Sequence, residues 1–473
     1  MIRANLAVAL TCVAAPAWAQ QTETTSTATT TVVDDLAFDA FLEAGKDPSP
    51  DVLGVGLRAD PNALFIEGIE IIGNEKTTPA VIRSRLVVEV GDLVDDDRIV
   101  QSRLRLLNTG FFKSVDFSLR RGSRRGRALL VVEVEERNTI LIDELFLGYS
   151  QVSPVFGGFG VAETNFLGRG VTVGGSFVLG RDRRALTMRV FVPNLANTPL
   201  QLSGSGILLS GAEVLDEDDP TGPALTYARR GGSLGFGLGV GPAQRISLVY
   251  RLESVHADRL PNLDPAVLRR APSIQFDDSV LSTLTASYEI DTRDDAFVPR
   301  VGTRIALAVE VGTSLILSGY EFSKYTAELQ HAITVFEDHS LILRLFGGMV
   351  QGQTPFFNQF FGADYAYFLL NRDALPRNVD VNFSESNDYD DLIVSTGAIY
   401  AVPIAGGGDL LYRMYLYGGV ELTATASLDE LQEDATGRGS GGQIPLSFDA
   451  GLKFDTAIGN FSLSLAYMMN VVL

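Results

Sequence analysis

A two-residue alternation of side chains from Thr139 to the end of the chain most constrains what this sequence can fold into. Residues 304–311, for example, read Arg-Ile-Ala-Leu-Ala-Val-Glu-Val, and residues 461–473 repeat the pattern. One face of each segment is apolar and the other is small or charged, the inverse of what a soluble barrel of this size buries. No run of 18 apolar residues offers a transmembrane helix. The sequence therefore predicts an all-β antiparallel barrel in lipid over residues 138–473.

The first 19 residues have the layout of a secretory signal peptide. Arg3 precedes an apolar run that ends at Ala15, and small residues flank Trp18, so we expect cleavage after Ala19. Lipidation at Cys12 is the less favoured alternative, because a threonine precedes it and the apolar run before it is short. Cys12 and Trp18 are the only Cys and Trp, so the mature chain is expected to have neither.

Residues 20–62 are rich in Thr, Asp and Pro and are predicted to be a flexible linker with one possible short helix at 35–44. The net charge of -20 argues against nucleic acid as a partner. Basic residues gather between Arg120 and Arg127, where a solvated turn is favoured over a contact with lipid headgroups.

Residues 63–137 are predicted to form a small α+β domain of order β-α-α-β-β. Its elements are a strand at 64–72, a helix at 79–86, a helix at 97–107, and strands at 111–117 and 129–135. The helices have N-cap signals at Thr77 to Pro79 and at Asp95 to Asp97. A basic turn joins the last two strands.

This order resembles the POTRA domain. The resemblance rests on Gly73-Asn74 after the first strand and on the Asn-Thr-Gly-Phe-Phe junction at 108–112 after the second helix. It implies a periplasmic domain that binds extended segments along a sheet edge. The candidate edge residues for client binding are Phe65, Ile69 and Phe117.

The barrel carries four stretches that resemble the BamA/TamA outer-membrane family, the bacterial surface antigen family of Gram-negative bacteria. They are Glu136 to Thr139, Asn165 to Gly170, Asp291 to Gly302 and Gly451 to Gly459. The resemblance implies a barrel of about 16 strands in the outer membrane, preceded by POTRA domains in the periplasm. Family members carry several such domains, whereas this sequence has room for one.

The long sixth loop of the family carries a Val-Arg-Gly-Phe-like motif, and the equivalent stretch here is 353–391. The arginine is missing from its register, and so is the aspartate expected to face it near 415–419. A buried arginine without its carboxylate is costly, so the loss of both is physically consistent. The candidate loop residues are Phe360, Phe361, Gly362 and the displaced arginines Arg372 and Arg377.

Without that ion pair, the loop is expected to be held inside the barrel by its aromatic residues. An interfacial girdle or an exposed loop cluster is the equally weighted alternative. The aromatics are Phe356, Phe357, Phe360, Phe361, Tyr365, Tyr367 and Phe368.

The end of the chain departs from the family as well. We count fifteen alternating segments, against the sixteen strands of the family, and the chain closes on a leucine rather than an aromatic residue. Either a strand in the region 260–277 is missed, or the barrel lacks its closing strand. We expect a weakly paired seam between the first barrel strand and the last. The candidate seam residues are Ile140, Leu147, Tyr467 and Leu473.

The sequence does not favour an enzyme. His256, His331 and His339 have no spacing typical of a metal site, and no nucleophile elbow, HExxH motif or phosphate loop is present. Acidic clusters such as Asp388 to Asp391 are interpreted as turns rather than cation sites. No catalytic residue, cofactor or metal is expected.

The resemblance implies a protein that assists the insertion, assembly or translocation of other polypeptides. The expected partners are outer-membrane lipid, unfolded outer-membrane client proteins and periplasmic accessory proteins. In this hypothesis the periplasmic domain receives an extended chain and the seam opens sideways. The alternative is a passive pore or structural barrel anchored by the periplasmic domain.

Overall fold

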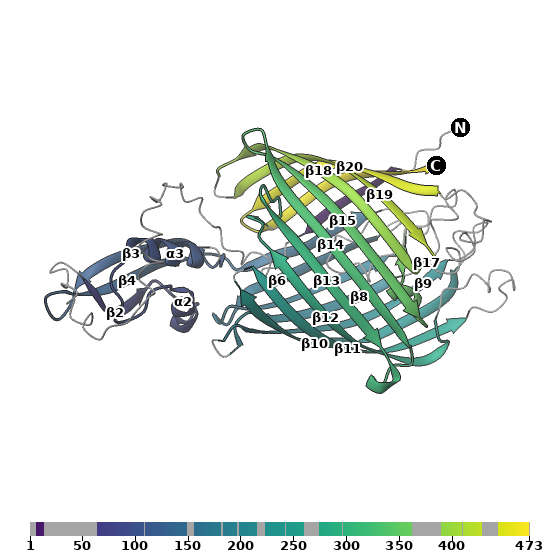
Figure 1. The fold of residues 1–473 in the computed structure, drawn as a ribbon, viewed down its shortest axis with the longest axis horizontal. Coiled ribbons are helices and arrows are strands. Elements are labelled where there is room, and N and C mark those ends of the chain that lie inside the picture. Colours follow the sequence, from purple (N-terminus) through teal and green to yellow (C-terminus); the bar gives the residue numbers. More distant parts are fainter. Residues whose placement is uncertain are drawn as a thin grey trace, which may run out of the picture.

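A small α+β domain and a large barrel follow one another along the long axis of the molecule (Figure 1). The computed structural model describes residues 6–13, 64–107, 109–148, 156–180, 183–195, 198–214, 223–241, 243–259, 274–295, 297–361, 389–408, 410–427 and 443–472. The predicted linker lies outside these residues. Of the predicted signal peptide, only the backbone of 6–13 is described.

The small domain has the predicted β-α-α-β-β order. Its elements are β2 (Phe65–Ile72), α2 (Pro79–Arg85), α3 (Asp96–Leu107), β3 (Phe112–Arg121) and β4 (Arg127–Glu136). The central strand β4 pairs in parallel with β2 and antiparallel with β3. Ile82 of α2 and Leu106 of α3 are fully buried against Val115 and Val132, which joins both helices to the sheet. None of the helices among the described residues is long and apolar enough to cross a membrane.

The two helices begin differently. Oδ1 of Asp95 accepts hydrogen bonds from the amides of Asp97 and Arg98 at 2.9 and 3.4 Å, which is the predicted N-cap of α3. Thr78 occupies the N-cap position of α2, but its side chain makes no capping hydrogen bond. The amides just before α2 are bound instead by the carboxylate of Glu136, at the end of β4.

Fifteen strands after residue 139 form the barrel wall within the described residues. They are β5 (Ile140–Gly148), β6 (Phe156–Phe166), β7 (Val171–Gly180), β8 (Arg183–Val192), β9 (Leu200–Val214), β10 (Pro223–Gly241), β11 (Gln244–Arg259), β12 (Asp277–Asp291), β13 (Gly302–Gly312), β14 (Phe322–Val335), β15 (His339–Gly352), β18 (Leu392–Gly406), β19 (Leu411–Ala426), β20 (Gln443–Thr456) and β21 (Gly459–Val472). This agrees with the count of alternating segments. Residues 260–273, most of the region in which a further strand was considered, lie outside the described residues.

The predicted alternation separates an outer apolar face from a charged lumen. On β13, Leu307 and Val309 are 46% and 39% exposed on the outside, whereas Arg304 and Glu310 form ion pairs inside. Antiparallel pairing continues around the ring from β5 to β21. The wall therefore has the inverted pattern that a barrel in lipid requires.

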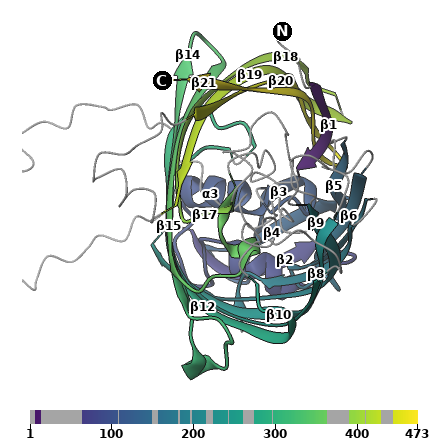
Figure 2. The ribbon, with the colours of Figure 1, turned by 90° about the vertical axis from the view of Figure 1, so that its right-hand side faces the viewer.

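A sixteenth strand closes the ring, and it comes from the N-terminal part of the chain rather than from the C-terminal end. β1 (Leu6–Val13) lies between β21 and β5 and pairs antiparallel with both (Figure 2). These residues belong to the segment predicted as a signal peptide, so the position of the sixteenth strand is filled by a segment expected to be removed.

The two ends of the long loop between β15 and β18 lie in the lumen. Its described parts are the 3-10 turn η4 (Phe356–Asn358) and the short strands β16 (Phe360–Phe361) and β17 (Tyr389–Asp390), which pair with each other. Figure 2 shows β17 inside the ring of strands. We call residues 353–361 and 389–391 the stem of the loop. Gly362, Arg372 and Arg377 lie outside the described residues.

Candidate functional site

The seam of the barrel is the place where β5 and β21 approach each other. They meet directly at one end, where the amide of Ile142 donates to the carbonyl of Ile458 at 3.0 Å. From there they diverge, and β1 fills the space between them. Its backbone pairs with β21 from Thr11↔Ser462 to Leu6↔Tyr467 and with β5 from Val13↔Glu144 to Leu10↔Leu147.

Strand parity explains why the seam is unusual. Fifteen successive antiparallel strands leave the first and the last, β5 and β21, running in the same direction. A strand between them is antiparallel to both, as β1 is. A β-bulge at Asp143 separates the part of β5 next to β21 from the part that pairs with β1. Bulges bend a strand, and this one lies where β5 leaves its neighbour.

The seam is held at its closed end by a glycine. Gly459 has φ +138°, and a Cβ there would lie 2.4 Å from the carbonyl oxygen of Ile142. A residue with a side chain would both strain the backbone and separate the two strands. We call the contact of Ile142 with Ile458 and Gly459 the seam pin.

The predicted seam residues are distributed around this arrangement. Ile140 is exposed and pairs with Glu163 of β6, while Leu473 lies outside the described residues. Leu147 and Tyr467 do not face each other, because β1 lies between their strands. The expectation of a seam directly between β5 and β21 is therefore corrected. Both strands pair with β1 over most of that distance.

The predicted client-binding edges differ in how open they are. Along β2, the carbonyl of Leu64 and both backbone groups of Ile66 are bonded to residues 91–94, so the edge next to Phe65 is covered. Ile69 and Phe117 pack against the core of the domain rather than facing outwards. On the opposite edge, β3 is exposed from Ser118 to Arg121.

The junction between the domain and the barrel is a set of hydrogen bonds that sequence reasoning missed. Within the small domain, Glu136 holds the loop before α2 by accepting from the amides of Thr77 at 2.6 Å and Lys76 at 2.8 Å. From that loop to the barrel, the amide of Thr78 donates to the carbonyl of Gly168 at 2.8 Å. Asn165 donates to the hydroxyl of Thr77. We call these contacts the junction latch. The signal was present in the sequence as the family stretch Asn165 to Gly170, but nothing in it indicated its partner.

The stem buries the first aromatics of the loop in the lumen. Phe356, Phe357 and Phe360 are 1%, 6% and 4% exposed. The ring of Phe356 makes edge contacts with Tyr227 of β10 at 5.2 Å and with Tyr389 at 5.1 Å between centroids. Tyr365, Tyr367 and Phe368 lie outside the described residues.

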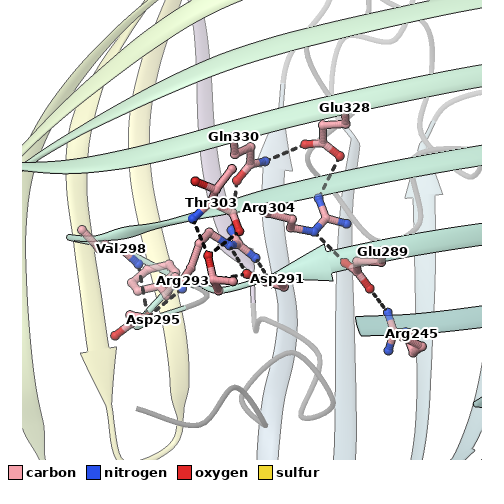
Figure 3. Close-up of polar contacts among 12 residues, drawn as sticks. Arg245, Glu289, Asp291, Arg293, Asp295, Val298, Thr303, Arg304, Glu328 and Gln330 are labelled. Atoms are coloured by element: carbon pink, nitrogen blue, oxygen red, sulfur yellow. Dashed lines mark hydrogen bonds and ion pairs between the residues drawn. The ribbon is translucent and has the colours of Figure 1, made fainter. Parts of the chain in front are cut away.

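Charged side chains line another part of the lumen as an alternating chain (Figure 3). Arg245 contacts Glu289, which binds Arg304 at 2.7 Å, and Arg304 binds Glu328 at 2.8 Å. The chain continues through Gln330 to Arg293 and Asp291. Four neighbouring strands and the turn after β12 contribute these residues, so charges of opposite sign meet across strands.

The family stretch from Asp291 to Gly302 builds its own turn. Asp294 accepts hydrogen bonds from the amides of Arg300 and Val301, and Asp295 accepts from those of Phe297 and Val298. This is the pattern of carboxylates that fold a turn. Among the described residues, no group of three His, Cys, Asp or Glu is placed to hold a metal ion. His256, His331 and His339 each have a hydrogen-bond partner, namely Asp278, Thr303 and Tyr400.

Two family descriptions match this chain. "POTRA: Surface antigen variable number repeat" covers residues 64–137, and "Omp85 superfamily domain" covers 165–363. BamA from Haemophilus ducreyi lacking POTRA domains 1–3 has a similar structure, with a TM-score of 0.59, 14% identity, and coverage of 87% of this chain and 81% of that one. CdiB from Escherichia coli has a TM-score of 0.52 at 8% identity, covering 94% and 100%.

Two curated relatives share the name Outer membrane protein assembly factor BamA. The one from Nitratidesulfovibrio vulgaris (strain Hildenborough) is 24% identical over 326 residues, which are 67% of this chain and 39% of the relative. The one from Neorickettsia risticii (strain Illinois) is 34% identical over 103 residues, 22% of this chain and 14% of the relative. The chain thus spans about two fifths or less of these relatives.

The POTRA fold, the inverted barrel and both family descriptions indicate the same cellular location. They place the barrel in the bacterial outer membrane and the small domain in the periplasm. The chain belongs to the Omp85 superfamily, as a BamA-type protein with a single POTRA domain among its described residues.

Proposed function

We propose that this protein assists the insertion, assembly or translocation of other polypeptides at the outer membrane, without an enzymatic step. One observation carries the proposal. β5 and β21 run in the same direction and diverge from the seam pin, leaving the place of one strand between them. Once residues 6–13 are removed with the signal peptide, both edges are open towards lipid. We call this place the seam slot.

Unpaired backbone groups in lipid each cost several kcal/mol. A client segment that enters the seam slot antiparallel to both edges forms backbone hydrogen bonds with β5 and β21. Its own backbone groups and those of the two edges are then paired. The register of β1 indicates the size of such a segment, because it pairs with β21 over Leu6 to Thr11. The names of the two curated relatives, assembly factors of the outer membrane, support the same role.

The POTRA domain supplies a second surface in this proposal. The exposed end of β3, Ser118 to Arg121, is the edge on which a periplasmic client or accessory strand is expected to pair. Because the side chain of Phe117 packs into the core, a crosslinker at Ser118 is better placed than one at Phe117.

Depletion combined with site-specific crosslinking tests the role. We expect depletion to lower the levels of other outer-membrane barrels in a quantitative proteome comparison. A photo-crosslinker at Leu463 of β21, beside the seam slot, should capture unfolded outer-membrane polypeptides in cells. The matched control is Leu307, which is similarly exposed on β13 across the ring.

Unchanged levels of every other outer-membrane barrel after depletion would contradict the assembly role. Equal capture at Leu463 and Leu307 would exclude the seam slot as the site where clients bind. Channel conductance with neither effect would favour a passive pore.

A further inference from the structure

The turn that joins β13 to β14 exposes two leucines almost completely. Leu315 is 91% exposed, more than any other large apolar residue in the described part of the chain, and Leu317 is 74% exposed. Leu315 lies in the 3-10 turn η3 (Ser314–Ile316), and Leu317 is its C-cap. Apolar side chains exposed together mark a contact with another protein or with a membrane. We call residues 313–319 the outer turn.

Hydrogen bonds hold the outer turn in this shape. The carbonyl of Thr313 accepts from the amide of Ser318 at 3.1 Å, and the amide of Gly319 donates to the carbonyl of Val280 on β12 at 2.7 Å. Leu317 has the left-handed conformation, with φ +70°, which is uncommon for a bulky residue. Such strain persists only where the surrounding structure imposes it. The exposure of the two leucines is therefore a fixed property of the turn.

The outer turn lies on the side of the barrel away from the POTRA domain. β13 is the ninth strand after that domain and successive strands are antiparallel, so β13 starts at the periplasmic side and ends at the outer leaflet. The turn, drawn in green at the bottom of both views, projects outwards from the ring on the side away from β1 (Figure 1 and Figure 2). It therefore faces the surroundings of the barrel and not its lumen.

The outer face of the neighbouring strands changes character at the level of this turn. On β12, Leu284 and Val280 are 38% and 40% exposed, and every second residue of a strand faces the same side. Two residues beyond Val280, Asp278 is hydrogen-bonded to His256 of β11 at 2.8 Å. Because Val280 also holds the outer turn, the turn meets the wall where the apolar face ends and charged residues begin. This is where the hydrocarbon meets the headgroups.

The other end of β14 (Phe322–Val335) carries a similar apolar residue. Phe336 is 76% exposed and has φ +48°. The 14 residues of β14 span about 46 Å, which a strand tilt of about 35–45° converts into a height of about 33–38 Å. The hydrocarbon core of a bilayer is about 30 Å thick. The outer turn and Phe336 are therefore spaced like the two interfaces of a membrane.

We infer that the outer turn is a lipid anchor, in which Leu315 and Leu317 insert among the acyl chains of the outer leaflet and hold this side of the wall at a fixed depth. Acyl chains fit as the occupant because residues 313–319 include no charged side chain and continue the lipid-facing surface of β13. Removing leucine side chains from water is favourable. The inference concerns how the barrel is held in the membrane and does not depend on the assembly role.

Tryptophan fluorescence tests the insertion. Residues 20–473 contain no Trp, so a single introduced Trp reports its own surroundings. Leu315→Trp protein in vesicles of phosphatidylcholine with brominated acyl chains should show blue-shifted emission and several-fold quenching relative to the unbrominated lipid. Leu307→Trp, on the outer face of β13, should be quenched as well. Val100→Trp, on an exposed position of α3, is the control in water and should not be quenched.

A polar substitution tests the anchoring. Asparagine tolerates the left-handed conformation better than leucine, so Leu317→Asn removes the apolar side chain without adding backbone strain. We expect the temperature at which the barrel unfolds in vesicles to fall by several degrees, as measured by heat-modifiable mobility on gels. The matched control, Val100→Asn, makes the same kind of change on the POTRA domain and should leave this temperature unchanged.

The inference is overturned if the emission of Leu315→Trp matches that of Val100→Trp and is not quenched, because the turn would then lie in water. Blue-shifted emission without quenching would also overturn it, since protein, such as a second copy of this chain, would then cover the turn. An unchanged or higher unfolding temperature for Leu317→Asn would mean that Leu317 contributes only backbone strain, and this result decides the question even where Leu315→Trp fails to fold.

Discussion

Asn165 of the barrel donates a 2.8 Å hydrogen bond from its side-chain amide to the hydroxyl of Thr77 in the POTRA domain, and both residues are buried. The other side-chain atom of Asn165 accepts from the amide of Gly170 at 2.8 Å, so the same residue folds the turn after β6. Because β6 pairs with β5, the first strand of the seam, the POTRA domain is attached one strand away from the place proposed to open.

Asn165→Ala is expected to loosen the junction. The substitution leaves the buried hydroxyl of Thr77 without this donor, and such a loss costs about 1–3 kcal/mol. Hydrogen exchange should become faster at the amides of residues 76–82, with little change in the rest of the domain. Combined with Thr77→Val, the effects should be less than additive, because both remove one bond. Additive effects would show that the bond contributes nothing.

Gly168→Ala should push the turn after β6 away from the loop before α2 in the POTRA domain by steric contact. A Cβ at Gly168, where φ is +68°, would lie 1.8 Å from the carbonyl oxygen of Lys76. Gly91→Ala is the control, since Gly91 also has a positive φ (+103°) but a Cβ there meets nothing within 4 Å. We expect faster proteolysis of the junction only for Gly168→Ala. If the two variants behave alike, backbone strain rather than the latch explains the effect.

Gly459→Ala should release the seam pin. Its Cβ would press on the carbonyl of Ile142, so exchange of the β5 amides is expected to rise and the temperature of unfolding in gel assays to fall. Gly407→Ala, in the turn between β18 and β19, has a similar positive φ (+97°) and no atom within 4 Å of the new Cβ. Comparable exchange in β5 for the two variants would exclude a specific role for the pin.

Leu145→Cys reports whether the seam slot is filled in the mature protein. Cys12 of β1 is the register partner of Leu145, and cross-strand neighbours lie within the Cα range of about 4.4–6.8 Å that a disulfide needs. We expect the mature chain to start after Ala19 and residue 145 to remain a free thiol, as judged by mass spectrometry. A disulfide between residues 12 and 145 would instead mean that the barrel retains β1 and closes its own seam.

Glu67→Gln should make the POTRA domain less stable at neutral pH but not in acid. Hydrogen bonds from the hydroxyl and the amide of Ser123 hold the pKa of Glu67 below its ordinary value. A carboxyl group with a lowered pKa stabilises the fold above its unfolded pKa of about 4.3, and that contribution disappears as the pH falls through the folded pKa. The difference in thermal unfolding between wild type and variant should be largest above about pH 5 and shrink below pH ~4. A constant difference across this range would contradict the linkage.

Much of the fold follows from local patterns. The alternation on β13, the turn residues and the caps of α3 are decided by neighbours within a few residues, so the β-α-α-β-β domain, the fifteen wall strands and the inverted barrel were predictable. The aromatic base of the long loop was also visible in the sequence, because Phe356, Phe357 and Phe360 lie close together in the chain.

The contacts between residues far apart in the chain were not predictable in this way. Asn358 meets Arg251, which is 107 residues away, and Asn165 meets Thr77, which is 88 residues away. Which residues meet across a barrel depends on strand register and on how the ring closes, and a period of two encodes neither. The alternation predicted fifteen wall segments but left open whether a further strand had been missed. Only the tertiary structure decided that β5 and β21 run in the same direction around a place for one more strand, because that follows from closing the ring.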